Sequence, residues 1–354
     1  MVLFFFLKTG RVCAQNNFNF RADVHSGLVL PEYSQFLYLV NEPVRGVEIS
    51  LTRSTKQENY WNQLYRQPEY GFTFQFTTTG NKSVFGYEYA LYPYFTIPII
   101  RRPSFLFFQQ YGFGIGYATK KFDLNSNPQN VAIGSHLNAH FNFKLGTKFI
   151  LTHKSALTVG LVFTHYSNAN MAEPNLGLNF AGVFTGITIG KPSAPPVNDL
   201  VVPAHIKKNE YALVMAAGGK HTRALQSDIY RAASITLEFK HHFFRKVHLG
   251  GGVDFSYDAS TEPEMRAKNK YNFKPIDNYR SGIHIAQEFV YNQFSFILQE
   301  GVYIGLTDKV NNHPIYTKAV VRYKVNSHWL VHFAMRSHLH ILDYPELAIG
   351  YRLE

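Results

Sequence analysis

Strict alternation of apolar and polar residues over 136–145 constrains the fold of this chain more than any other feature. Five apolar residues alternate there with five polar ones: Leu137, Ala139, Phe141, Phe143 and Leu145 against His136, Asn138, His140, Asn142 and Lys144. Successive side chains of a β-strand point to opposite faces, so one face of this strand is continuously polar. A buried sandwich face cannot be so polar. The pattern suits a membrane barrel with a wet interior and an outer wall facing lipid.

The same alternation recurs along the chain, as at Phe72–Phe76, Ala233–Phe239 and Trp329–Met335. Aromatic residues make up 16% of the sequence, and rims of outer-membrane barrels carry aromatic girdles. A soluble β-sandwich remains the alternative, because it also alternates and favours Phe and Tyr. We predict an all-β fold, a transmembrane antiparallel β-barrel of outer-membrane type. We expect about 14 strands, within a range of 12 to 16, in a single barrel over residues 15–354.

Two segments, residues 1–14 and residues 191–209, do not follow the strand pattern. Met1 to Leu7 is a short apolar block, and Ala14 suits a signal-peptide cleavage site. Lys8 and Arg11 follow the block instead of preceding it, so we expect over residues 1–14 a signal peptide with a truncated start. Cys13 is the only cysteine. Residues 191–209 contain four prolines and predict an irregular connection.

The formal net charge is +11, with a pI near 9.4. Such a charge favours an anionic partner. We find no zinc-finger spacing, helix-turn-helix pattern or RNP-like motif, so nucleic acid is not an expected partner. Arg and Lys equally suit the phosphates of a lipid.

Candidate chemistry lies at the end of a predicted strand over 157–167. His165 and Ser167 share one face with Leu157, Val159, Leu161 and Phe163. A serine hydrolase needs at least a hydroxyl nucleophile and a general base beside it. The following loop supplies amide side chains that could donate to an oxyanion, Asn168, Asn170 and Asn175. Ordinary polar residues at a barrel rim are the alternative reading.

The segment His165-Tyr166-Ser167-Asn168-Ala169, followed by Pro174-Asn175 and Gly177, resembles the signature of the outer-membrane lipid A 3-O-deacylases, also called acyloxyacyl hydrolases. The resemblance covers about residues 157–190. The strands from 105 onward, with Ile133-Gly134-Ser135-His136, are similar to longer Bacteroidetes-type members. The resemblance implies a catalytic pair on the outer barrel wall, with Ser167 as nucleophile, His165 as general base and Asn168 in the oxyanion hole.

One position departs from the family pattern. Studied members have a glutamate where this chain has Asn179. A carboxylate there would orient and stabilise the imidazolium, whereas an asparagine can only orient it. Asn179 can lie beside His165 in an antiparallel hairpin, and we prefer it. Glu173 is the alternative acid, if the loop folds back.

These observations predict a serine esterase of the bacterial outer membrane that removes an ester-linked acyl chain from lipid A or lipopolysaccharide. Membrane lipids are the expected surroundings, and no cofactor is needed. His136, His140, His248 and His332 have the spacing of lumen residues rather than metal ligands. The alternative from another class is a catalytically silent barrel, acting as a pore or a structural protein.

Overall fold

The structure is a computed structural model that describes residues 18–31, 34–55, 59–168, 171–191, 200–222, 228–338 and 341–353. The expected signal peptide over 1–14 lies outside these residues and stays a prediction. No helix in the described ranges is both long and apolar enough to cross a membrane.

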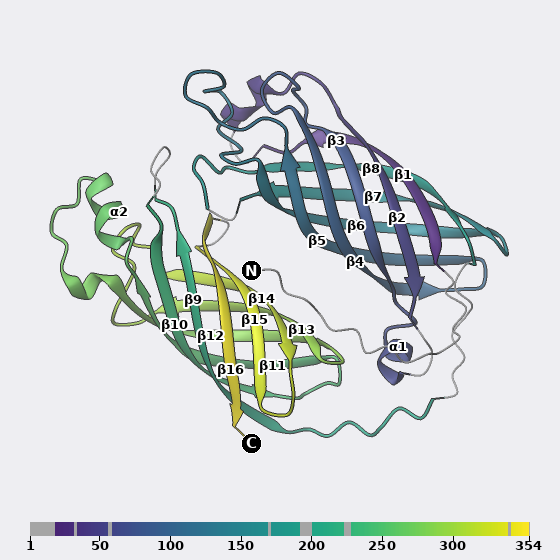
Figure 1. Ribbon diagram of the computed structural model, residues 1–354. Coiled ribbons are helices and arrows are strands. Elements are labelled where there is room, and N and C mark those ends of the chain that lie inside the picture. The colour runs from purple at the N-terminus through teal and green to yellow at the C-terminus, as the bar shows by residue number, and fades with distance from the viewer. Residues whose placement is uncertain are drawn as a thin grey trace.

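The described chain forms two closed antiparallel barrels of eight strands each (Figure 1). The first contains β1 (Asn19–Val29), β2 (Val44–Ser54), β3 (Glu69–Thr78), β4 (Tyr87–Arg101), β5 (Phe105–Ala118), β6 (Leu137–Thr152), β7 (Ser155–Ser167) and β8 (Leu178–Ile189). The second contains β9 (Asn209–Lys220), β10 (Tyr230–His241), β11 (Val247–Asp258), β12 (Tyr279–Tyr291), β13 (Phe294–Tyr303), β14 (Ile315–Lys324), β15 (Trp329–His338) and β16 (Ile341–Leu353).

The all-β, outer-membrane-type barrel fold is confirmed, and sixteen strands lie at the upper limit of the expected range. The prediction of a single barrel over 15–354 is wrong. β8 pairs with β1, and β16 pairs with β9, so the hydrogen-bonded ladder closes twice. Alternation of apolar and polar residues identifies strands, but it carries no information on which distant strand closes a sheet. The predicted number of strands was therefore equally compatible with one larger barrel.

Two closures also explain the proline-containing connection at 191–209. An even number of strands returns the chain to the end of the barrel at which it entered. β8 therefore ends, and β9 begins, at the same end, and the connection joins one barrel to the next. Residues 200–208 contain no helix or strand, and 192–199 lie outside the described residues.

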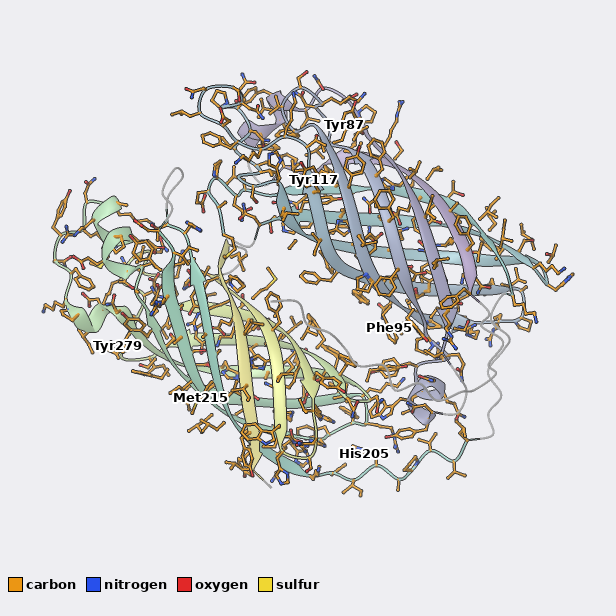
Figure 2. The ribbon with its side chains drawn as sticks, in the orientation of Figure 1. Tyr87, Phe95, Tyr117, His205, Met215 and Tyr279 are labelled. Atoms are coloured by element: carbon orange, nitrogen blue, oxygen red, sulfur yellow. The ribbon has the colours of Figure 1, made fainter. Side chains whose placement is uncertain are left out.

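Both barrel walls are apolar outside and polar inside. On β3, Phe72 and Phe74 are exposed whereas Thr73 and Gln75 are buried. Figure 2 shows Met215 of β9 on the outer side of the second barrel, where the side chain is half exposed. An apolar exterior around a closed sheet is the surface that a lipid bilayer requires.

Ion pairs fill the interior of each barrel. In the first, Lys144 Nζ lies 2.7 Å from carboxylate oxygens of both Asp23 and Glu48, and all three side chains are fully buried. In the second, Lys220 Nζ lies 2.5 Å from Asp343 and 3.2 Å from Asp258. Barrels of eight strands have room for little besides their own side chains, and both interiors are occupied in this way.

The two ends of the first barrel differ. The connections from β1 to β2, β3 to β4, β5 to β6 and β7 to β8 lie at one end; they include the loops 79–86 and 119–136, and η1 (Ser34–Leu39). The opposite end has the short turns 102–104 and 153–154, together with α1 (Tyr60–Leu64). Long loops mark the external end of an outer-membrane barrel. Tyr87 and Tyr117, exposed at this end (Figure 2), match an aromatic girdle.

The second barrel repeats this asymmetry. Its long connections within the described residues are 259–278 and 304–314, and the first contains α2 (Thr261–Ala267) and η2 (Pro275–Asn278). Its short turns are 242–246, 292–293 and 325–328. Figure 1 shows α2 and the long loops of the first barrel toward the upper left, whereas α1 lies toward the lower right. The two barrels therefore present their long loops in the same direction.

Candidate active site on the outer wall of the first barrel

β7 places a base and a hydroxyl side by side at the external end of the first barrel. Residues two apart on a strand share a face, so His165 and Ser167 both point outward, in line with Leu161 and Phe163. His165 Nε2 lies 3.0 Å from Ser167 Oγ, within hydrogen-bonding distance. Ser167 is 6% exposed and His165 is half-buried. The pair thus lies at the edge of the lipid-facing wall.

β8 supplies the third member of this arrangement. His165 and Asn179 are register partners in the β7–β8 ladder, and His165 Nδ1 lies 2.6 Å from Asn179 Oδ1. A carboxamide oxygen can only accept a hydrogen bond, so Nδ1 carries the proton. The lone pair of Nε2 is then directed at the Ser167 hydroxyl, which is the arrangement that a general base requires.

Gly177 holds the turn into β8 against His165 and Ser167. Its φ is +75°, in the left-handed region that favours glycine. A Cβ at this position would lie 3.1 Å from His165 Cε1 and 3.6 Å from Ser167 Cβ. The glycine therefore provides both the backbone conformation and the space beside the imidazole.

The Asn168 side chain organises the loop that follows Ser167. Its Nδ2 donates to the Ala172 carbonyl at 2.7 Å, and its Oδ1 accepts from the amides of Met171 and Ala172. The backbone N–H of Asn168 donates to Asn175 Oδ1 at 2.9 Å. Within the described residues, the bond to Ala172 uses one of the two Nδ2 hydrogens of Asn168. Asn170 lies outside the described residues.

Glu173 lies in the same loop, and burial raises the pKa of its carboxyl group. His165 Nδ1 faces the Asn179 oxygen, so the position of an orienting group is taken by Asn179 and not by Glu173. Within the described ranges, no group of three or more His, Cys, Asp and Glu side chains is arranged to hold a metal ion.

Sequence reasoning missed a small apolar recess beside Asn179. Its walls come from the end of β1, the following loop and the β7–β8 loop: Val29, Leu30, Pro31, Phe36, Leu176 and Gly177. Closure of the barrel brings β1 next to β8. No local pattern in the sequence could have indicated that neighbour.

Comparisons with known proteins match the two barrels separately. A family model described as lipid A 3-O-deacylase (PagL) matches residues 45–188, within the first barrel. A second, described as the C-terminal domain of acyloxyacyl hydrolase, matches residues 209–354, which contain the second barrel. Together the two models cover most of the chain. No match is found among curated proteins.

Solved structures of outer-membrane proteins are also similar to the chain. The outer membrane enzyme PagL has 19% identity and a TM-score of 0.35, covering 47% of this chain and 97% of its own. Neisserial surface protein A has 8% identity and a TM-score of 0.33, covering 49% and 96%. Because both TM-scores are below 0.5, the fold assignment rests on the chain's own strand pairing.

Proposed function

The chain belongs to the lipid A 3-O-deacylase (acyloxyacyl hydrolase) family of outer-membrane hydrolases, and from that premise we propose that it removes an ester-linked acyl chain from lipid A by serine catalysis. The observation that carries this proposal is the hydrogen-bonded series Asn179–His165–Ser167 on the outer wall of the first barrel. A nucleophile that faces lipid, and not the barrel interior, suits a substrate that is itself a membrane lipid.

In the proposed reaction, Ser167 Oγ attacks the acyl carbonyl carbon while His165 Nε2 takes the hydroxyl proton. The imidazolium then gives this proton to the departing sugar oxygen, which leaves an acyl group on Ser167. Water, deprotonated by the same imidazole, releases the fatty acid and restores the serine. The remaining Asn168 amide hydrogen donates to the oxyanion in both steps.

Asn179 orients the imidazole without stabilising its positive charge. A carboxylate would do both, because the imidazolium forms as the tetrahedral intermediate forms. We therefore expect Asn179→Glu to raise kcat above that of the wild-type chain, and Asn179→Ala to lower it. If kcat fell in both variants equally, the neutral amide would be the group that this site requires.

The polar, histidine-containing faces of the strands also left a pore as an alternative function. The barrel interiors give that function little support. Lys144, Asp23 and Glu48 close the middle of the first barrel as a fully buried set. Arg322 Nη2, 2.7 Å from Glu238, does the same in the second.

Mass spectrometry of lipid A from a Gram-negative host tests the proposal. The host would express the wild type or Ser167→Ala, each shown to be folded in the outer membrane by heat-modifiable migration. Loss of one acyl mass with the wild type, and none with Ser167→Ala, is the expected result. Unchanged lipid A with a folded wild-type barrel would contradict the proposal and favour a catalytically silent barrel.

A further inference from the structure

An apolar hollow lies on the outer wall of the second barrel, outside the site described above. Its volume is about 410 Å³, and it is open along its outer side and not enclosed. Strands β14, β15 and β16 form it, and its lining is Val321, Tyr323, Val331, His332, Phe333, Leu347 and Ala348. Most of these side chains point outward from the wall, so the hollow opens toward lipid.

The wall that bears this hollow meets the first barrel. The rings of Phe113 on β5 and Phe333 on β15 lie 6.3 Å apart between centroids. Nearer the short turns, Phe95 of β4 contacts Tyr291 edge-on at 4.9 Å. Figure 2 shows Phe95 on the side of the first barrel that faces the second. Tyr65 Oη, which donates to the Val290 carbonyl at 2.6 Å, adds a hydrogen bond between the barrels.

Strand register connects His165 to this contact across neighbouring strands of the first barrel. Phe113 pairs with Phe141 on β6, Phe141 pairs with His165 on β7, and His165 pairs with Asn179 on β8. These four residues form one row across the outer wall. Since adjacent strands are about 4.8 Å apart, His165 lies about 10 Å along the wall from the Phe113–Phe333 contact.

The hollow extends from the row of Phe333 into the bilayer. Val321, Phe333 and Leu347 are register partners and form its first row. Val331 lies two residues nearer the short turn 325–328 than Phe333 does. The hollow therefore runs from the Phe333 row toward the short-turn end. Acyl chains of a lipid anchored at the external rim run in the same direction.

We propose that this hollow binds a second acyl chain of the same multi-acyl lipid whose ester is held at Ser167. The inference rests on the proposed lipid A hydrolysis and gives the second barrel a part in it. Aliphatic side chains and the Phe333 ring pack against the second chain, while the first chain lies along β7 and β8. The outer surface of the second barrel then makes the enzyme selective for substrates with several acyl chains.

Photochemical cross-linking tests where the second chain lies. Full-length Ser167→Ala protein in nanodiscs would be irradiated with lipid A that carries a diazirine on a chain other than the cleaved one. Labelling of β14–β16 peptides is expected, at least fivefold above that from a two-chain glycerophospholipid with the same diazirine. Equal labelling by the two lipids would mean that the hollow holds ordinary surrounding lipid, and would overturn the proposal.

Filling the hollow gives the second test. Leu347→Trp reduces its volume, whereas Leu237→Trp is the matched control, because Leu237 is exposed to lipid on β10, away from the hollow. Leu347→Trp in the Ser167→Ala background should reduce the cross-link at least fivefold, and Leu237→Trp should leave it unchanged. In the active chain, Leu347→Trp should raise KM for lipid A about tenfold without changing kcat/KM for a single-chain ester.

These outcomes separate the inference from the proposed function. Hydrolysis of lipid A by the wild type without specific labelling of β14–β16 would overturn the inference and leave the function standing. Specific labelling without any hydrolysis would overturn the function, and the hollow would remain a binding site for multi-acyl lipid. An equal rise in KM for the single-chain ester would also overturn the selectivity role.

Discussion

The two barrels share a wall architecture but differ where the chemistry is placed. β7 and β15 are the seventh strands of their barrels, and each carries an outward serine at its external end, Ser167 and Ser337. On β7 the outward residue two positions earlier is His165, whereas on β15 it is Met335. Asn179 is the partner of His165 on β8, and Pro345 is the partner of Met335 on β16.

At the place on β15 that corresponds to His165, Ser337 therefore has Met335 and not a histidine. Its hydroxyl lies 2.7 Å from the hydroxyl of Thr317 on β14. A lipid-facing wall and a serine at the rim are thus available in both barrels, but among the described residues the series Asn179–His165–Ser167 has no counterpart on β15 and β16. The difference suggests that this fold supplies a position in the membrane, and that the proposed reaction depends on three side chains.

Serine substitution should show the largest contrast between the barrels. Ser167→Ala removes the proposed nucleophile and should lower kcat for acyl hydrolysis by at least about 10³-fold, as the same change does in serine hydrolases. Ser337→Ala should leave kcat unchanged. Rates of fatty-acid release from lipid A in detergent measure both. A loss of activity in Ser337→Ala would place chemistry in the second barrel and break the comparison.

Breaking the buried ion pairs should show whether the barrels unfold independently. Lys144→Met removes the cation that Asp23 and Glu48 share and leaves Asp23 beside Arg21 and Glu48 beside His25, so the loss of stability should be at most about 3–5 kcal/mol. Urea unfolding in detergent should show one transition moved to lower urea, assigned to the first barrel by limited proteolysis. Lys220→Met is the matched change in the second barrel. If either variant moved the unfolding transitions of both barrels, the two barrels would unfold as one cooperative unit.

Glycine substitution should separate backbone strain from crowding of the histidine. Gly177→Ala introduces a Cβ 3.1 Å from His165 Cε1, and displacement of the imidazole should lower kcat about 10²-fold. Gly305→Ala, in a loop of the second barrel, is the control: φ there is +76°, so the backbone strain is the same. The Cβ added at Gly305 would lie 3.6 Å from Ser281 Oγ, an ordinary van der Waals distance. This variant should retain wild-type kcat. Equal losses of kcat in Gly177→Ala and Gly305→Ala would mean that backbone strain alone lowers activity.

The smallest effect is expected at Glu173. Because Asn179 occupies Nδ1 of His165, Glu173→Gln should change kcat by no more than about twofold. Burial raises the pKa of Glu173 in the folded chain, so ionisation opposes loop packing as pH rises through that pKa. Glu173→Gln should therefore protect the loop from proteolysis at neutral pH, and not at low pH. A large loss of kcat would identify Glu173 as the acid.

Much of the wall could be predicted from the sequence because it depends on local periodicity. Alternation at 136–145 correctly separated the lipid-facing Phe141 and Phe143 from the buried His140 and Lys144. The hairpin geometry of β7 and β8 also made Asn179 a reasonable neighbour for His165. His136 is an exception, since it lies before β6 and its Nδ1 is 2.8 Å from the Ala118 carbonyl.

By itself, the sequence determined the strands, their lipid-facing sides and the spacing of His165 and Ser167, because each depends on residues close together in the chain. Only the tertiary structure decided that the ladder closes at β8 and again at β16, and that β15 lies against β5. Those pairings join segments far apart in sequence, and every antiparallel strand offers the same backbone donors and acceptors to any partner. The hollow on the second barrel, and its place near the contact between β5 and β15, follow from that choice of partners.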